Sequence, residues 1–452
     1  MIYLLCFIIV KFYLFNQTIA EDALSPLILT PYLDKNNIEA ARRLSKVTPD
    51  IGGMTSYAGY FNVNKTCDNN LFMWFFPAKD DWLEAPVILW LQGGPGWTSM
   101  YGLFELVGPF NSFPSGLQSR NYSWSNLSNI LFIDNPVGTG FSFTTGGCYA
   151  DSIDIVVEGL YLAIIQFFKL FPELRNSKLF LSGESFAGRY IPPLAVKIHR
   201  MLEENKTSLN LAGIVVGGPM MNTVCHDYGS FLYHLGIADS KLRDDLNKHQ
   251  QKMKANVEVK NYTAAFENWV YIIENLIGNK TGIKNTYNFL PESPDLSNYS
   301  EFVIESAIRG QIHVGNTNFS NANFDVYKRL RHTIIQSSSS SVEELLKTRK
   351  YIVGFYSGQL DIICMYTSTV CVLEDLNWPG RTEYMDGPRK IWYHNGEVVG
   401  WFKTADNLLL EVLIRDAGHS VSYYKPELTY NLIHSIISAP PGVNPLWKLS
   451  TS

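Results

Sequence analysis

Short apolar runs alternate along this chain with longer segments in which apolar residues recur at helical spacing. The runs Val87–Leu91, Asn129–Asp134 and Lys178–Ser182 are apolar almost throughout, which is typical of strands buried on both faces of a sheet. Residues 158–171 instead place apolar side chains three to four positions apart and end before Pro172, as expected of a helix. This alternation predicts an α/β fold with a mostly parallel central sheet and helices on both faces.

Further elements fit the same layout. Residues 185–203 predict a second helix, and Asn395-Gly396 between strand-like runs at 391–399 predicts a β-hairpin. More strands are expected at Tyr57–Val63, Leu71–Phe76, Leu211–Val216, Tyr351–Ser357 and Leu408–Arg415.

The N-terminus resembles a secretory signal peptide. Ile2–Val10 is apolar except for the amphipathic Tyr3, and Thr18-Ile19-Ala20 fits a small-residue cleavage site, although Lys11 interrupts the apolar region. An N-terminal anchor is the alternative, but so short a run does not span about 30 Å of hydrocarbon. We see no later run long enough to cross a membrane, and we expect a signal peptide at residues 1–20.

Asparagine sequons point to the same compartment. Eight Asn-x-Ser/Thr tripeptides follow residue 20, and together they predict an N-glycosylated protein that is secreted or lysosomal. Their asparagines are Asn64, Asn121, Asn126, Asn205, Asn261, Asn279, Asn298 and Asn318.

Residues 226–350 differ in character from the rest of the chain. They are richer in Lys, Asn and Glu, and they contain a run of five serines, Ser337–Ser341. We interpret this segment as a helical insertion, or cap, with a flexible linker at the serine run that would expose a site for proteolysis. The expected organisation is a first part of the core at 21–225, the insertion at 226–350 and a second part of the core at 351–452.

Composition excludes several classes of protein. The 452 residues include 37 Lys and Arg against 42 Asp and Glu, for a net charge of −5. This balance argues against a nucleic-acid-binding protein, which needs basic residues to neutralise phosphates, and the 46% hydrophobic content argues against a disordered chain.

Five cysteines lie outside the expected signal peptide, so an oxidising compartment would leave at least one thiol unpaired. They are Cys67, Cys148, Cys225, Cys364 and Cys371, and the sequence does not fix their pairing. No cysteine or histidine spacing suggests a zinc site, and we expect neither a metal nor another cofactor.

A candidate nucleophile follows the strand at 178–182. In Gly183-Glu184-Ser185-Phe186-Ala187 a buried strand runs through a sharp turn into a helix, and the small flanking residues let the two elements approach closely. This is the layout of a nucleophile elbow, which presents the serine hydroxyl at the edge of the sheet. A serine in an ordinary strand-to-helix turn is the alternative.

Two later residues favour the nucleophile. Asp361 follows the strand at 351–357, and His419 follows the strand at 408–415, so both lie where parallel sheets place their ligands. The order Ser185, Asp361, His419 is that of an α/β-hydrolase. His419 would take the proton from Ser185, and Asp361 would orient the imidazole and stabilise its charged form.

The turn Gly93-Gly94-Pro95-Gly96 supplies a candidate oxyanion hole, although a Gly/Pro loop can also be a simple turn. Backbone without side chains can approach a substrate closely, and the amides of Gly94 and Phe186 are the predicted donors. Such a pair contributes roughly 3 kcal/mol or more to transition-state stabilisation.

These motifs together resemble the serine carboxypeptidase family, and the vitellogenic-like carboxypeptidases in particular. The resemblance covers residues 30 to 440 and rests on the segments Trp90–Gly96, Asp134–Phe143, Gly183–Gly188, Gly358–Asp361 and Asp416–His419, with Ile312–Asn316 and Asn395-Gly396 adding to it. It implies a secreted or lysosomal exopeptidase that removes one C-terminal residue from peptides or proteins.

The resemblance also implies where the substrate binds. In the family, an Asn or Gln, a glycine of the turn and paired glutamates hold the terminal carboxylate of the peptide. The substrate-binding candidates are accordingly Trp90, Gln92, Gly93, Glu184 and Glu105. Two carboxyl groups that share a proton would favour activity at acid pH.

Several positions depart from the family pattern. Leu106 stands where the second glutamate belongs, and Glu105 is one residue early, which turns a helical side chain by about 100°. Ser420 and Ser422 replace Met and Pro after the histidine, and Trp97 replaces a small residue or Cys. These departures put carboxylate recognition and the preference of the leaving-residue pocket in question.

Two other functions remain open on the same scaffold. A serine carboxypeptidase-like acyltransferase would form the same acyl-enzyme and pass it to an acceptor other than water. The altered residues at 106, 420 and 422 leave room for a non-catalytic secreted binding protein.

Overall fold

A central sheet organises the chain in the computed structural model, which describes residues 25–290, 298–440, 442–446 and 449. The sheet has eleven strands in the order β1-β2-β6-β3-β8-β9-β10-β13-β12-β11, with β7 paired to β2. Neighbours from β6 to β13 run parallel, and the outer pairs run antiparallel. The bounds are β1 Tyr57–Asn64, β2 Asn69–Phe76, β3 Val87–Leu91, β6 Asn129–Ile133, β7 Phe143–Thr144, β8 Leu179–Glu184, β9 Leu211–Gly217, β10 Ile352–Gly358, β11 Lys390–His394, β12 Glu397–Ala405 and β13 Leu409–Ile414.

The strands predicted from the apolar runs are all present, and their mostly parallel pairing confirms the predicted fold class. Alternate side chains of each central strand enter two separate cores. In β2, Met73 and Phe75 belong to one core, whereas Phe72 and Trp74 belong to the other. A separate hairpin of β4 Phe110–Phe113 and β5 Gly116–Ser119 was not predicted, because β5 is largely exposed and polar.

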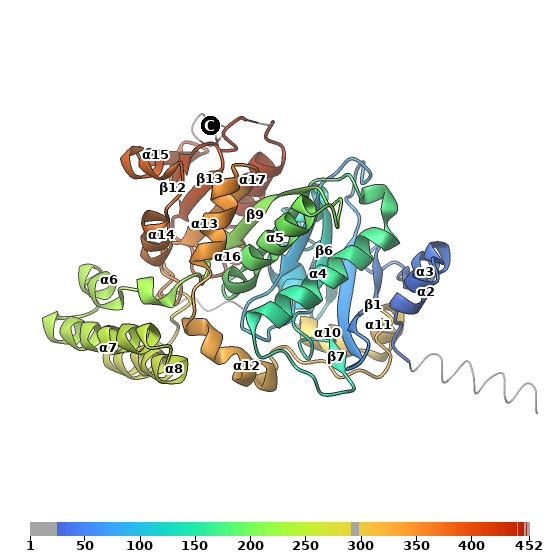
Figure 1. Ribbon diagram of the computed structural model, residues 1–452, viewed down its shortest axis with the longest axis horizontal. Coiled ribbons are helices and arrows are strands. Elements are labelled where there is room, and N and C mark those ends of the chain that lie inside the picture. Colours follow the sequence, from blue (N-terminus) through green and yellow to red (C-terminus); the bar gives the residue numbers. More distant parts are fainter. Residues whose placement is uncertain (1–24, 291–297, 441, 447–448, 450–452) are drawn as a thin grey trace, which may run out of the picture.

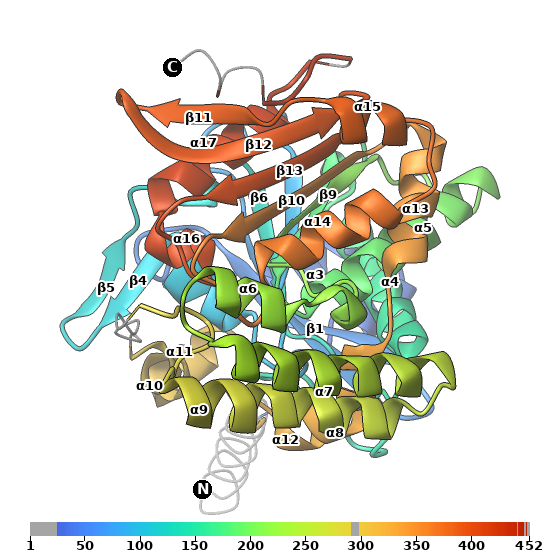
Figure 2. The same cartoon turned by 90° about the vertical axis from the view of Figure 1, so that its left-hand side faces the viewer.

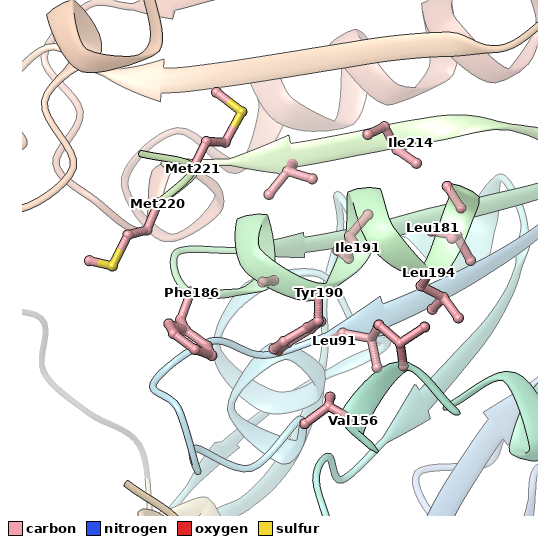
Figure 3. Packing of buried hydrophobic residues seen from close by; sticks show 14 of the residues in the cluster. Leu91, Val156, Leu181, Phe186, Tyr190, Ile191, Leu194, Ile214, Met220 and Met221 are labelled. Atoms are coloured by element: carbon pink, nitrogen blue, oxygen red, sulfur yellow. The ribbon is translucent and has the colours of Figure 1, made fainter. Parts of the chain in front are cut away.

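Helices cover both faces of the sheet (Figure 1). One face carries α4 Ile153–Leu170, α5 Ala187–Glu203 and α13 Ser339–Thr348, and the other carries α16 Val421–Tyr424 and α17 Pro426–Ile437. Figure 3 shows how α5 packs beside β3, β8 and β9 through buried apolar groups: Phe186, Tyr190, Ile191 and Leu194 on the helix side, and Leu91, Leu181 and Ile214 on the strands. This contact fixes the helix whose first turn follows Ser185.

The segment expected to be an insertion is helical where it is described, and α6, α7 and α8 gather beside the sheet (Figures 1 and 2). The helices are α6 Tyr228–His234, α7 Ser240–Glu258, α8 Tyr262–Tyr271, a π-helix Ile272–Gly278, α9 Asn279–Thr281, α10 Tyr299–Ile304, α11 Ser306–Gln311 and α12 Phe324–Leu330.

The flexible linker predicted at Ser337–Ser341 is wrong. Ser339–Thr348 form helix α13, and Ser338 is buried. The Ser338 amide donates to the Met221 carbonyl at 3.0 Å, and its hydroxyl donates to the Gly188 carbonyl at 2.6 Å. These two bonds to distant backbone dock the serine run onto the start of α5 and onto the segment after β9.

Among the five cysteines that the structure describes, two disulfides form and one thiol is left, as their odd number requires. Cys67 is bonded to Cys148, and Cys225 to Cys371, while Cys364 is a buried free thiol. The bond from Cys225 ties the turn Thr223–Cys225, which directly precedes the 226–350 segment, to α14 Tyr366–Asp375. In the described residues, no helix is long and apolar enough to cross a membrane, and the expected signal peptide lies outside them.

We expect a broad-specificity protease to leave the peptide bonds at 337–341 intact in the folded protein. The backbone there is helical or hydrogen-bonded to the core, so it does not enter a protease cleft without local unfolding. Mass spectrometry of early fragments is the measurement, and an early cut within the serine run would contradict the structure.

Candidate active site

Ser185 occupies a sharp turn between β8 and α5. Its backbone is left-handed, with φ of +63°, a conformation that is uncommon for a residue with a side chain. Neighbouring glycines make the turn possible: a Cβ on Gly183 would lie 2.1 Å from the Leu91 carbonyl oxygen, and one on Gly93 would lie 2.8 Å from the Ser185 Cβ. The turn has the geometry of a nucleophile elbow.

Asp361 and His419 meet in a buried hydrogen bond. The distance from His419 Nδ1 to Asp361 Oδ2 is 2.7 Å, and the two residues are 3% and 0% exposed. Asp361 Oδ1 also accepts the amide of Cys364 at 3.0 Å. Because Nδ1 faces a carboxylate, it carries the proton, which leaves Nε2 as a base; this buried nitrogen has no hydrogen-bond partner among the described residues.

Ser185 and His419 lie against the same turn at the end of β9. The Ser185 amide donates to the Gly217 carbonyl at 2.9 Å, and a Cβ on Gly218 would lie 3.0 Å from His419 Nδ1. Ser185, Asp361 and His419 follow β8, β10 and β13, which pair with β9 or with each other in the sheet. The structure thus gathers the three predicted residues at the carboxyl ends of adjacent parallel strands, the arrangement of an α/β-hydrolase.

Electrostatics stabilise the charged form of His419 relative to an ordinary imidazole. Burial alone would lower the pKa of the imidazole, but the charge and hydrogen bond of Asp361, assisted by the charge of Glu184, raise it above its ordinary value of 6.5. The Asp361 carboxylate therefore stabilises the imidazolium that proton transfer from Ser185 would create.

A short strap from the 226–350 segment joins the loops that carry Asp361 and His419. We use this name for residues 286–289. The Thr286 carbonyl accepts the amides of Ile362 and Ile363, each at 3.0 Å, and the Phe289 amide donates to the Leu360 carbonyl at 3.1 Å. The strap thereby fixes the loop on both sides of Asp361.

The same strap also holds the histidine. The Tyr287 carbonyl accepts the His419 amide at 2.7 Å, and the two rings meet edge to face with centroids 5.1 Å apart. Sequence reasoning missed these residues, because backbone hydrogen bonds leave no trace in residue identity and the strap lies far from either loop in the sequence.

The amides of Gly94 and Phe186 are available for the predicted oxyanion hole. Within the described residues, neither amide donates a backbone hydrogen bond outside the helices and strands. A Cβ on Gly93 would lie only 2.7 Å from the Phe186 nitrogen, so the two loops touch where the donors are expected. Gly94 has φ of +117°, which requires glycine. The assignment of the two amides to an oxyanion remains a prediction.

Buried Asp134 positions the glycine turn. Its Oδ1 accepts the Thr98 hydroxyl at 2.6 Å and the Ser99 amide at 2.8 Å, and its Oδ2 accepts the Phe141 amide at 2.9 Å. Ser99 in turn accepts the Gln92 amide on its hydroxyl at 3.2 Å. Burial raises the pKa of Asp134 to about 6, although the three donors favour its ionised form. The sequence marked Asp134 only as part of a family motif.

Glu184 directly precedes Ser185 and lies in a hydrogen-bonded cluster. The Trp90 indole donates to Gln92 Oε1 at 3.2 Å, which turns Gln92 Nε2 toward Glu184 Oε1 at 2.8 Å. Ser420 Oγ donates to the same carboxylate oxygen at 3.0 Å. Burial raises the pKa of Glu184, and the charge of His419 and these two donors act against it. Two predicted residues, Gly93 and Glu184, thus lie against Ser185, and Gln92 and Trp90 connect to them through hydrogen bonds.

Glu105 is the fifth of the predicted substrate-binding residues. It is buried in the π-helix Gly102–Leu106, where the Val107 amide reaches back to the Gly102 carbonyl at 2.8 Å, so the side-chain steps differ from those of the α-helix assumed above. Burial raises the pKa of Tyr101 and of Tyr299, and the charge of Glu105 adds to this; the same charge opposes the lowering of the Arg120 pKa by burial. Its role toward a substrate remains a prediction.

One group of residues in the described part has metal-ligating atoms close together. It consists of Cys225, Cys371 and Asp375, and the two sulfurs are joined in a disulfide, so they offer no thiolate to a metal.

Replacing Asp134 by Ala would leave two amides and a hydroxyl without an acceptor in a buried site. We expect the variant to lose about 3 kcal/mol of stability, because each stranded donor costs about 1–3 kcal/mol and some will rebond. Chemical denaturation measures this loss, and the exposed Asp80, changed to Ala, is the control. Equal stability of the two variants would contradict the role given to Asp134.

Comparisons with known proteins agree with this geometry. A family model described as serine carboxypeptidase matches residues 49–439. The venom serine carboxypeptidase of Apis mellifera is 39% identical over 428 residues, covering 91% of this chain and 91% of the relative. The vitellogenic carboxypeptidase of Aedes aegypti is 36% identical over 425 residues, covering 91% of this chain and 89% of the relative.

A human relative and a solved structure extend the comparison. The probable serine carboxypeptidase CPVL of Homo sapiens is 38% identical over 438 residues, covering 92% of this chain and 90% of the relative. The crystal structure of a prohormone-processing carboxypeptidase from Saccharomyces cerevisiae superposes with a TM-score of 0.73 at 22% identity, covering 88% of this chain and 96% of that chain, which shows a shared fold. With a family model that spans most of its length and relatives this similar, the chain belongs to the serine carboxypeptidase family.

Proposed function

We propose that this chain is an active serine-type carboxypeptidase that releases the C-terminal residue of a peptide through an acyl-enzyme on Ser185. The observation that carries the proposal is the buried His419–Asp361 hydrogen bond, which leaves the second imidazole nitrogen open beside the strained turn of Ser185. An imidazole whose Nδ1 is held by a carboxylate can accept a proton at Nε2.

The residues divide the reaction into two steps. His419 Nε2 takes the Ser185 proton as the hydroxyl oxygen attacks the last peptide carbonyl, and the amides of Gly94 and Phe186 stabilise the oxyanion. His419 then gives the proton to the leaving amino group, the C–N bond breaks and the acyl-enzyme remains. A water molecule repeats the sequence with His419 as base, which releases the shortened peptide and restores the Ser185 hydroxyl.

Carboxypeptidase specificity requires a group that binds the terminal carboxylate. We assign this task to the Gln92 side chain, the Gly93 backbone and Glu184 in its protonated form, with Trp90 orienting Gln92. A protonated carboxyl donates to a carboxylate, whereas an ionised one repels it, so burial of Glu184 favours binding by raising its pKa.

The secretory pathway is the proposed location. Two disulfides require an oxidising compartment, and all the sequon asparagines are exposed except Asn298, which is half-buried.

An acyltransferase and a non-catalytic protein remain the competing functions. Product analysis with alcohol acceptors identifies the first, and absence of any Ser185-dependent reaction identifies the second.

Replacing Ser185 by Ala should abolish peptidase activity, with a loss in kcat of roughly 10⁵-fold or more because the acyl-enzyme can no longer form. Release of the C-terminal amino acid from a blocked dipeptide, followed by chromatography, measures the effect. The exposed Ser340, changed to Ala, is the matched control. Unchanged hydrolysis in the Ser185 variant of the purified glycosylated protein would exclude the proposal.

The pH dependence should differ between peptide acids and peptide amides. His419 must be neutral to act as a base, and its raised pKa means that kcat/KM for a peptide amide climbs with pH to above 6.5 and then levels off. Peptide acids also need a protonated Glu184, so their kcat/KM falls again at higher pH, and their optimum lies at lower pH. Superimposable pH profiles would contradict the assignment of Glu184.

A further inference from the structure

Two successive hydrogen bonds lead from Tyr101 through Ser420 to Glu184. Tyr101 Oη donates to Ser420 Oγ at 3.4 Å, and Ser420 Oγ donates to Glu184 Oε1 at 3.0 Å. With its oxygen accepting from Tyr101, the Ser420 hydroxyl has its proton free to point at the carboxylate. We call this chain the hydroxyl relay: Tyr101, Ser420 and Glu184.

Only one member of the relay titrates in the working pH range. A serine hydroxyl does not ionise in this range, and burial raises the pKa of Tyr101 further above its ordinary value of 10. Ser420 therefore donates at every pH. Because a donor stabilises the ionised carboxyl more than the neutral one, Ser420 shifts the balance of Glu184 toward its ionised form.

The two donors also decide which oxygen of Glu184 holds the proton. Gln92 Nε2 and Ser420 Oγ both donate to Oε1, at 2.8 and 3.0 Å. An oxygen that already accepts two hydrogen bonds is a poor place for an acidic proton, so the proton of the neutral form belongs on Oε2. The relay thus leaves Oε2–H as the donor that can meet a ligand carboxylate.

Several elements contribute charged and titratable groups that interact with Glu184. Burial dominates its raised pKa, the charge of His419 lowers it and that of Asp361 raises it. Groups whose own pKa is raised in part by the charge of Glu184 are Tyr101, Tyr287, Tyr356, Cys364 and His419. The structure gives two hydrogen-bond donors to the Glu184 carboxylate, Gln92 and Ser420. The Ser420 hydroxyl can be deleted while the Gln92 amide and the side chains of His419 and Asp361 stay in place.

We propose that Ser420, oriented by Tyr101, is a specificity-determining positioning residue that sets the pH above which the enzyme stops selecting peptides with a free C-terminal carboxylate. The ligand class is a peptide that ends in a carboxylate, as opposed to the same peptide ending in an amide. The proposal rests on the proposed function only in naming Glu184 as the group that meets this carboxylate.

Binding to a protein that cannot turn over its ligand tests the relay directly. The probe is a blocked dipeptide acid and its amide, and their Kd is measured by calorimetry between pH 4 and pH 8 in the Ser185→Ala protein. We call the break the pH above which the Kd of the acid begins to rise. We expect this rise to be about tenfold per pH unit, because one proton is lost from Glu184, and we expect the Kd of the amide to show no such rise.

Ser420 variants test whether the Ser420 hydroxyl sets the pH of the break. In Ser420→Ala the missing donor should move the break upward by about one pH unit, so that above the original break the acid binds up to about tenfold more tightly than to the parent. Ser420→Thr keeps the hydroxyl and should restore the break. Tyr101→Phe should shift it in the same direction as Ser420→Ala by a smaller amount. A merely structural role for Ser420 would weaken acid and amide alike and would leave the break in place.

The outcomes separate this inference from the proposed function. A break that does not move in Ser420→Ala, or one that acid and amide share, overturns the relay even if the parent enzyme hydrolyses peptides. A break that moves as described supports the relay even if the parent enzyme proves inactive, in which case the proposed catalysis fails and the carboxylate site stands. A downward shift in Ser420→Ala also overturns the inference, because it would mean that Ser420 stabilises the neutral carboxyl.

Discussion

The hydrogen bond between His419 Nδ1 and Asp361 is the contact on which the rest of the site depends. A carboxylate with no exposed surface is costly unless its oxygens are bonded, and Asp361 has an imidazole on one oxygen and the Cys364 amide near the other. The strap at 286–289 holds both loops by their backbones, so the bond does not rely on side-chain packing alone. The 226–350 segment therefore helps to hold Asp361 and His419 in place, because the strap belongs to it.

A second constraint is steric and concerns the nucleophile. Ser185 adopts its left-handed conformation because Gly183 and Gly93 let strand, turn and neighbouring loop approach to distances that a side chain would forbid. Asp134 holds the loop that contains Gly93 through hydrogen bonds from Thr98 and Ser99. The same approach brings Gly93 against the Phe186 amide, so the elbow and the candidate oxyanion site share one cause.

Local sequence predicted the features that depend on local chemistry. Continuous apolar runs located the buried strands, and serine, acid and base after three of them located the site, because parallel strands end at a common edge. Contacts between distant segments left no such signal. The strap bonds through backbone, Ser420 reaches Glu184 across 236 positions, and the serine run was misinterpreted because its folding depends on a Gly188 carbonyl far away. Glu105 was placed on an assumed α-helix, whereas a π-helix changes every side-chain direction within it.

The central claim is that Ser185 is a nucleophile activated by the His419–Asp361 pair. The most direct measurement is the rate at which a fluorophosphonate modifies the intact protein between pH 5 and pH 8, with the modified residue identified by mass spectrometry. We predict modification of Ser185 alone, at a rate that rises as His419 loses its proton and that falls by roughly 10⁴-fold in Asp361→Asn. Absence of modification at every pH, or a rate that neither pH nor the Asp361 substitution alters, would contradict the account.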